Sequence, residues 1–200
     1  MEHKITLKIS FMKGINYFCE MQQKNLLIGG PGTGKTSVLN ELMKLPYECF
    51  PEISREVILK AQQKGIDQLF LSKPLLFSKM LLEGREQQYL KAIKSKSEIV
   101  FFDRGIPDIH AYMDYFKTEY PSSFKEKSKH YKYNKIFHFS PWKEIHKKDN
   151  ERYESFEETV EIDVFLMKAY LDLGYTIINV PFGSVKERTN FIINSLSCDL

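Results

Sequence analysis

Eight consecutive residues, Gly29 to Thr36, have types and spacing that suit the binding of phosphate. They read GGPGTGKT and satisfy the pattern G-x-x-x-x-G-K-[ST]. Glycines let consecutive backbone amides turn toward an anion, and a helix that begins directly after them points the positive end of its dipole at the same place. A lysine adds charge for the terminal phosphates, and a hydroxyl beside it can ligate Mg²⁺. The segment therefore predicts a loop that binds the phosphates of a nucleoside triphosphate together with Mg²⁺.

Within this loop, Lys35 is expected to reach the β- and γ-phosphates, and Thr36 to place its hydroxyl on Mg²⁺. A glycine-rich turn without a ligand is the alternative. The context argues against it, because the apolar run NLLIGG predicts a strand before the motif and an apolar stripe predicts a helix after it. The predicted nucleotide contacts are Gly30, Pro31, Gly32, Thr33, Gly34, Lys35, Thr36 and Ser37.

A second candidate lies where the apolar segment Ile99–Phe102 ends at Asp103. A carboxylate at the end of a buried strand can orient Mg²⁺ or its water, whereas a buried aspartate paired with Arg104 is the structural alternative. Many ATPases of the motor type carry a glutamate directly after this aspartate to activate water. Here Arg104 occupies that position, and an arginine suits the binding of phosphate or of an acceptor. This favours transfer to a bound molecule over hydrolysis.

The segment PEISREV, Pro51 to Val57, offers candidate contacts to an acceptor. Glu52 could take a proton from an acceptor hydroxyl, and Arg55 could hold an anionic group. A carboxylate that caps a helix, followed by a solvated arginine, fits the same residues.

The charged segment KKDNERYESFEE, residues 147 to 158, predicts a mobile lid at the start of a long helix. Arg152 is its candidate catalytic residue, and Lys148 is a second candidate for phosphate contact. Charge runs of this kind are more often solvated helix faces, which is the alternative.

The elements that must position these residues alternate between strand and helix. Strands are expected from Asn25, over Tyr47–Glu52, Ile99–Phe102, Lys135–Ser140 and Thr176–Val180, with helices between them. The alternation implies right-handed crossovers and a mainly parallel five-stranded sheet between two helical layers, with ligands at the carboxyl ends of the strands. Residues 1–24 predict an N-terminal β-hairpin extension, and residues 25–200 form the predicted nucleotide-binding domain. A helix from Asp149 carries the apolar stripe Phe156, Val160, Val164, Met167 and Leu171.

Composition excludes several other classes. Lys and Arg outnumber Asp and Glu by only 29 to 26, so no nucleic-acid partner is implied. Three widely spaced cysteines match neither a disulfide framework nor a metal site and favour the cytoplasm. No run reaches the ~18 apolar residues of a membrane span. The basic stretch Lys125–Lys135 could attract acidic lipid, although a solvated surface is the simpler interpretation. The oligomeric state stays open.

Five segments together resemble a family of predicted ATPases of the P-loop kinase type, over about residues 24 to 195. They are GGPGTGKTSVLNEL, PEISREV, FFDRGIPDIHAY, KDNERYESFEE and NVPFGSVKERTNFI. The resemblance implies a three-layer α/β/α P-loop fold with sheet order 2-3-1-4-5 and a helical lid, similar to nucleoside and nucleotide kinases and more distantly to ribosylnicotinamide kinases. FFDRG is similar to the Asp-Arg strand ending of thymidylate and deoxynucleoside kinases. That likeness implies roles at magnesium, phosphate or acceptor for Asp103 and Arg104, and a catalytic carboxylate at Glu52. Gly105 replaces an aromatic residue of thymidylate kinases, which makes thymidylate a poor candidate for the acceptor.

These observations predict a cytoplasmic kinase that uses ATP and Mg²⁺ and phosphorylates a small nucleoside- or nucleotide-like acceptor. The alternative is a P-loop NTPase that hydrolyses ATP or GTP to drive a conformational or binding switch. A guanine-specific switch usually carries Asn-Lys-x-Asp, and the nearest match, Asn134–Phe137, lacks the aspartate. Adenine is therefore the expected base, near Pro181–Val185.

Overall fold

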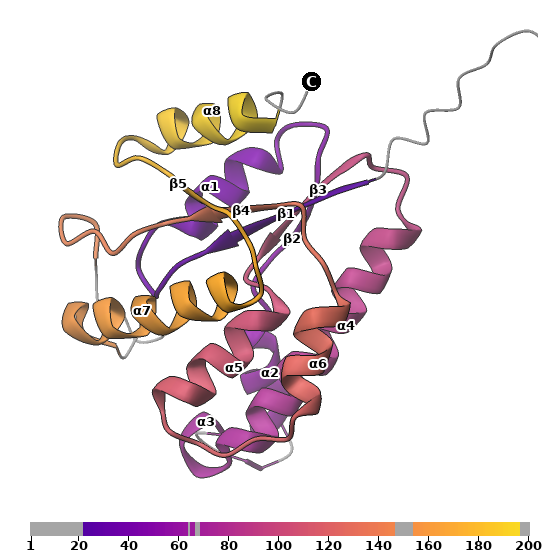
Figure 1. The fold of residues 1–200 in the computed structure, drawn as a ribbon, viewed down its shortest axis with the longest axis vertical. Coiled ribbons are helices and arrows are strands. Elements are labelled where there is room, and N and C mark those ends of the chain that lie inside the picture. Colours follow the sequence, from indigo (N-terminus) through magenta and orange to yellow (C-terminus); the bar gives the residue numbers. More distant parts are fainter. Residues whose placement is uncertain (1–21, 64, 67–68, 147–153, 197–200) are drawn as a thin grey trace, which may run out of the picture.

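The computed structural model describes residues 22–63, 65–66, 69–146 and 154–196 (Figure 1). The predicted hairpin therefore lies almost wholly outside the described residues, as do Lys148, Arg152 and most of the predicted lid. Strand β1 begins at Gln23, two residues before the expected start.

Five parallel strands form one sheet in the order β2-β3-β1-β4-β5, which confirms the predicted fold class. The register pairs Leu27 with Asp103 and Ile28 with His138. The central strand β1 and its neighbours β3 and β4 therefore end at the same edge. The strands are β1 Gln23–Ile28, β2 Glu48–Phe50, β3 Ile99–Asp103, β4 Lys135–His138 and β5 Ile177–Asn179.

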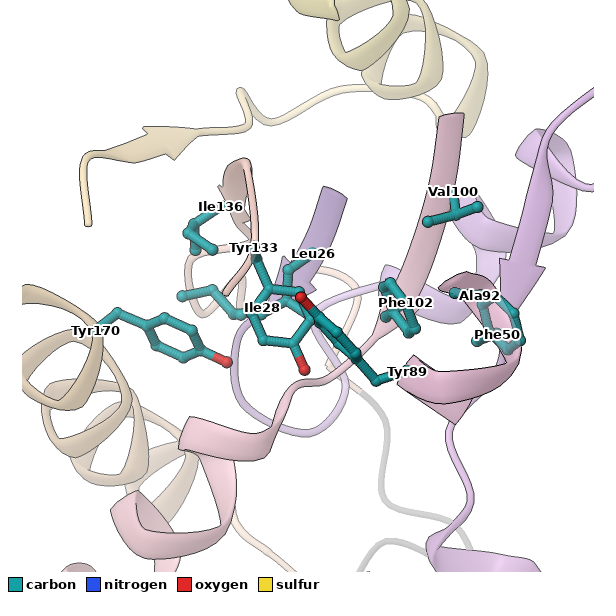
Figure 2. Close-up of a cluster of buried hydrophobic side chains, with 10 residues drawn as sticks. All are labelled: Leu26, Ile28, Phe50, Tyr89, Ala92, Val100, Phe102, Tyr133, Ile136 and Tyr170. Carbon is teal, nitrogen blue, oxygen red and sulfur yellow. The ribbon is translucent and has the colours of Figure 1, made fainter. Parts of the chain in front are cut away.

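Successive residues of β1 point to opposite faces of the sheet and so build two separate cores. Leu27 joins the cluster formed with α1 and α8, whereas Leu26 and Ile28 join the cluster formed with α4 and α7 (Figure 2). A strand covered on both faces reads as a continuous apolar run, as observed here. The helices are α1 Lys35–Leu42, α2 Ser54–Gln62, α3 Leu69–Ser72, α4 Pro74–Lys94, α5 Ile106–Tyr115, α6 Ser123–His130, α7 Phe156–Asp172 and α8 Val185–Leu196.

A third core joins helices α2 to α6 in the lower part of Figure 1, next to the sheet. Val57 of α2, Leu81 of α4 and Ile109 of α5 are buried in it. This helical group stands over the carboxyl end of β2, where Glu52 follows the strand.

Helix α7 corrects two predictions. It begins at Phe156, not at Asp149, because the Ser155 hydroxyl accepts from the Glu158 amide at 3.1 Å and the Glu158 carboxylate accepts from the Ser155 amide at 2.6 Å. The predicted stripe is also wrong, since Val164 is 63% exposed and Leu166 is fully buried. The helix is apolar on two adjoining faces, and periodicity does not reveal which face docks. The buried face carries Thr159, Ile162, Leu166, Ala169 and Tyr170.

The basic stretch Lys125–Lys135 does not form one surface. Lys135 is buried in β4 and donates to the Ser195 carbonyl at 2.6 Å, and Lys127 pairs with Glu86 at 2.6 Å. Lys135 is therefore too buried to take part in the predicted contact with acidic lipid, and a contact through the other lysines stays a prediction. Within the described ranges, no helix combines the length and the apolar character that crossing a membrane requires.

Candidate functional site

The phosphate-loop motif lies between β1 and α1 in the predicted context. Gly34, immediately before α1, has φ of 86°, and a Cβ there would lie 2.6 Å from Nη1 of Arg188. Gly29 has φ of 141°, and its Cβ would lie 2.4 Å from the Phe139 carbonyl oxygen. Both positions favour glycine, because their positive φ strains any other residue, and at Gly29 a side chain would also clash with the backbone directly after β4.

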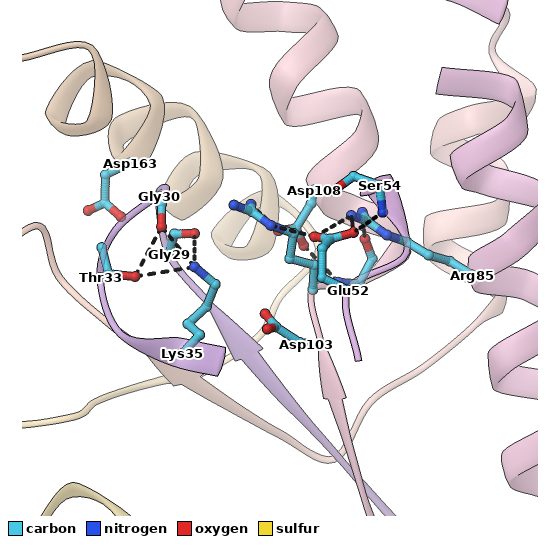
Figure 3. Close-up of polar contacts among 12 residues, drawn as sticks. Gly29, Gly30, Thr33, Lys35, Glu52, Ser54, Arg85, Asp103, Asp108 and Asp163 are labelled. Carbon is cyan, nitrogen blue, oxygen red and sulfur yellow. Dashed lines mark hydrogen bonds and ion pairs between the residues drawn. The ribbon is translucent and has the colours of Figure 1, made fainter. Parts of the chain in front are cut away.

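The ammonium group of Lys35 lies inside the loop. It donates to the Gly29 carbonyl at 2.8 Å, to the Gly30 carbonyl at 2.7 Å and to the Thr33 hydroxyl at 3.2 Å (Figure 3). Burial, with a contribution from the positive charge of Arg104, lowers the pKa of Lys35 to about 7. An anion in the loop would raise this pKa again and so favour the charged lysine.

Two oxygen ligands meet beside the lysine. The Thr36 hydroxyl, in the first turn of α1, donates to Oδ2 of Asp103, at the end of β3, at 3.1 Å. The other oxygen, Oδ1, is buried and has no hydrogen-bond partner among the residues that the structure describes. Burial raises the pKa of Asp103, and the positive charge of Lys35 offsets part of this rise.

These oxygens fit Mg²⁺, which binds few protein ligands and takes further oxygens from phosphates. The described part of the chain has no group of three or more His, Cys, Asp or Glu residues that could hold a metal by itself. A cation at Thr36 and Asp103 would therefore depend on the nucleotide for its remaining ligands.

On the other side of β3, two arginines surround Glu52. Arg104 Nε lies 2.6 Å from one Glu52 oxygen, and Arg85 Nη2 lies 3.3 Å from both oxygens. The carboxylate also accepts from the backbone amides of Ile53 and Ser54 at 2.9 and 3.1 Å (Figure 3). Burial alone would raise the pKa of Glu52, but Arg85 and Arg104 outweigh it and the pKa is lowered.

Arg85 was not among the residues predicted from the sequence. It comes from α4, and the helical spacing of the sequence could have shown that it is buried. It shares one buried face of the helix with Ser78, Leu81, Tyr89 and Ala92. An arginine inside an apolar stripe marks a buried charge that needs a partner.

Arg104 and Asp108 complete this cluster. Arg104 has φ of 71°, and its amide donates to the Leu27 carbonyl at 3.0 Å, which ties it to the phosphate-loop strand. Its guanidinium lies 3.5 Å from Asp108 and 5.4 Å from the Tyr112 ring centroid. Asp108 also accepts from the Gly105 amide at 2.9 Å.

Two other predicted contacts remain outside this arrangement. Arg55, which was predicted to hold an anionic group, is exposed in the first turn of α2, whereas Arg85 pairs with Glu52. Arg152 lies outside the described residues, so its predicted role stays a prediction.

A sequence profile for a family described as an AAA domain matches residues 24–188, most of the chain. The chain belongs to this AAA-domain family. No curated protein sequence matches it. The match of this AAA domain spans the phosphate loop, the Glu52 cluster and nearly all of the sheet.

Solved structures share the fold of this AAA domain at low identity. Deoxyadenosine kinase from M. mycoides, solved with dCMP and dCDP, has a TM-score of 0.63 and 16% identity over 87% of this chain and 98% of its own. Thymidylate kinase from Ehrlichia chaffeensis has a TM-score of 0.58 and 17% identity over 88% of this chain and 100% of its own. NadR in complex with NR has a TM-score of 0.68 and 16% identity over 88% of this chain, but the match covers 50% of NadR. The AAA domain thus has the fold of P-loop nucleoside and nucleotide kinases.

The outer side of the loop holds a further arginine that the sequence prediction missed. Arg188 of α8 donates to the Thr33 carbonyl at 2.7 Å, and its guanidinium lies 4.6 Å from the Phe139 ring centroid and 5.7 Å from that of Trp142. Trp142 stacks on Phe182 with 4.9 Å between ring centroids. In this AAA domain, the phosphate loop is therefore supported from outside by an arginine and an aromatic pair. The spacing from Arg188 to Ile192, on the buried face of α8, was the available signal.

Proposed function

We propose that this AAA domain binds ATP with Mg²⁺ and transfers the γ-phosphate to the hydroxyl of a small nucleoside- or nucleotide-like acceptor. The observation that carries the proposal is the placement of Asp103 between the two halves of the site. Figure 3 shows Asp103 between Lys35 of the phosphate loop and Glu52. The adjacent residue, Arg104, contacts Glu52.

The phosphate loop would hold the triphosphate through its backbone amides, with Lys35 on the terminal phosphates. Thr36 and Asp103 would hold Mg²⁺, which would supply positive charge that stabilises the phosphates during transfer. Oδ1 of Asp103, which is buried and has no hydrogen-bond partner among the described residues, supports this assignment.

The acceptor would lie beside Glu52. Its carboxylate is fixed by two arginines and two backbone amides, so it can orient a hydroxyl by accepting its hydrogen bond. Phosphoryl transfer has a loose transition state, and positioning together with charge stabilisation supplies most of its catalysis. The lowered pKa keeps Glu52 ionised at neutral pH.

We assign the base to the aromatic side of the site. Phe182 is 58% exposed and stacks on Trp142 beside Arg188, and it lies in the segment where adenine is expected. An exposed aromatic face suits the stacking of a purine ring. The cytoplasm is the proposed location, supported by the number and spacing of the cysteines in the sequence.

ADP release from Mg·ATP, measured against a panel of nucleosides, nucleotides and ribosylnicotinamide, tests the function. We expect release to depend on one class of acceptor and to fall by at least about 100-fold in Lys35→Ala. Full release without any acceptor, still dependent on Lys35, would instead establish the hydrolysing NTPase.

A further inference from the structure

The terminal nitrogens of Arg85 are already bound on the acceptor side. The side chain is 5% exposed, Nη2 contacts both oxygens of Glu52 at 3.3 Å, and Nη1 donates to the Gly105 carbonyl at 2.6 Å. The carbonyl is part of the backbone and Glu52 is itself held by two amides, so neither partner can leave without other losses. Arg85 is therefore built into the wall of the site.

Arg104 is fixed in a similar way. Nε contacts Glu52 at 2.6 Å, Nη1 lies 3.5 Å from Asp108, and the guanidinium lies over the ring of Tyr112. The side chain is 12% exposed. An arginine that is meant to bind a phosphate presents a free edge of two N–H donors, and here a carboxylate occupies one such edge.

The charges of this cluster balance. Arg85 and Arg104 supply two positive charges, while Glu52 and Asp108 supply two negative charges. A phosphate monoester would bring about 1.5 to 2 further negative charges at pH 7. To bind it, a guanidinium would have to leave Glu52, and the carboxylate would remain buried beside a second anion.

An uncharged hydroxyl needs no such rearrangement. It can donate to Glu52 by taking over one of the two long 3.3 Å contacts from Arg85 Nη2, which keeps its contact with the other oxygen. The cost of desolvating a hydroxyl is also far below that of a phosphate dianion.

We infer that the acceptor is an uncharged polyhydroxyl molecule of the nucleoside class, and that nucleoside monophosphates are discriminated against by the carboxylates already paired with Arg85 and Arg104. This inference rests on the proposed kinase function. In the transfer, a bond forms between the acceptor oxygen and the γ-phosphorus, and the bond from that phosphorus to the β,γ-bridging oxygen breaks. ADP leaves with the electron pair, and the hydroxyl proton passes to Glu52 and then to water.

The test compares each nucleoside with its own 5′-monophosphate as acceptor for the wild-type chain at saturating Mg·ATP. Initial rates of ADP formation and calorimetric binding are both measured. We expect kcat/KM for the preferred nucleoside to exceed that for its monophosphate by at least about a hundredfold, because binding the monophosphate disrupts a buried ion pair. Equal or better use of the monophosphate overturns the inference and leaves the kinase function standing. ADP release at one rate with every acceptor and with none overturns the kinase function itself.

A charge variant tests the cause of this preference. Glu52→Gln leaves Arg85 and Arg104 without their shared carboxylate, so binding of the monophosphate should tighten about tenfold while nucleoside turnover falls. The matched control is Glu56→Gln, an exposed glutamate of α2 paired with Lys60, which should change neither quantity. Monophosphate binding that stays unchanged in a folded Glu52→Gln protein would overturn the role of the paired carboxylate. If this variant does not fold, the wild-type comparison decides by itself.

Discussion

The hydroxyl of Thr36 donates to the carboxylate of Asp103 at 3.1 Å, across 67 residues of sequence. Thr36 lies in the first turn of α1 and Asp103 ends β3, and parallel pairing of β1 with β3 brings these two positions together. The parallel sheet therefore places the two proposed magnesium ligands within hydrogen-bond distance of each other.

Thr36→Ala and Asp103→Asn should each weaken ATP binding in the presence of Mg²⁺ by at least about tenfold, because each removes one oxygen ligand. Binding measured in excess EDTA should change much less. Titrations of ATP with and without Mg²⁺ give this ratio, and Thr176→Ala, at an exposed position, is the control. Equal losses with and without the metal would argue against these ligands.

Lys35 predicts a coupling between ATP binding and proton uptake. Its pKa is about 7 in the folded protein, mainly because of burial, whereas an unfolded lysine titrates near ~10.4. At pH 8 the folded chain therefore lacks a proton that bound phosphates restore, and about one proton should be taken up on ATP binding. Calorimetry in buffers of different ionisation enthalpy measures it. Lys35→Met at saturating ATP should lose this uptake, and an unchanged value would refute the assignment.

The same shift predicts how stability depends on pH. Between pH 7 and about 10.4 the unfolded state binds more protons at this site than the folded state, so the free energy of unfolding rises with pH there. Denaturant unfolding at several pH values, compared with Lys35→Met, isolates this contribution. A Lys35→Met protein with the same pH dependence as the wild type would contradict the prediction.

His138 should act in the opposite direction. Burial lowers its pKa, but hydrogen bonds from Nε2 to Asp163 at 2.9 and 3.1 Å raise it above the ordinary value. Stability from this pair is thus fully present below about pH 6.5 and is lost as the pH rises through the folded pKa. Asp163→Asn should cost about 1–2 kcal/mol more at pH 5.5 than at pH 9. Asp172→Asn, an exposed carboxylate on the same helix, is the control, and a cost independent of pH would exclude the coupling.

Arg188 should matter for nucleotide binding although we assign it no chemistry. Arg188→Met removes the bond to the Thr33 carbonyl and the cation–π contacts that support the loop, so ATP affinity should fall roughly tenfold. Lys186→Met, exposed on the same helix, should have little effect. Affinities measured for both variants, with melting temperatures to confirm folding, check the prediction. Full ATP affinity in a folded Arg188→Met protein would show that Arg188 does not contribute to nucleotide binding.

The phosphate loop and the order of strands and helices could be predicted from local sequence patterns. The phosphate loop is contiguous, so the types of Gly34, Lys35 and Thr36 specify its conformation and its ligand class without distant partners. The strand and helix order follows from short apolar runs and periodic stripes, and parallel connection leaves few possible sheet orders. A local signal also marks the start of α8, where the Ser184 hydroxyl accepts from the Glu187 amide at 3.3 Å.

Docking between elements decided the rest. Arg85 pairs with Glu52 because α4 packs against the end of β2, and Arg188 reaches Thr33 across 155 residues because α8 covers α1. The buried face of α7 was likewise set by its contact with α5. A helical period states which residues share a face, but the choice among apolar faces depends on the shape and charge of the neighbour, which only the folded chain contains.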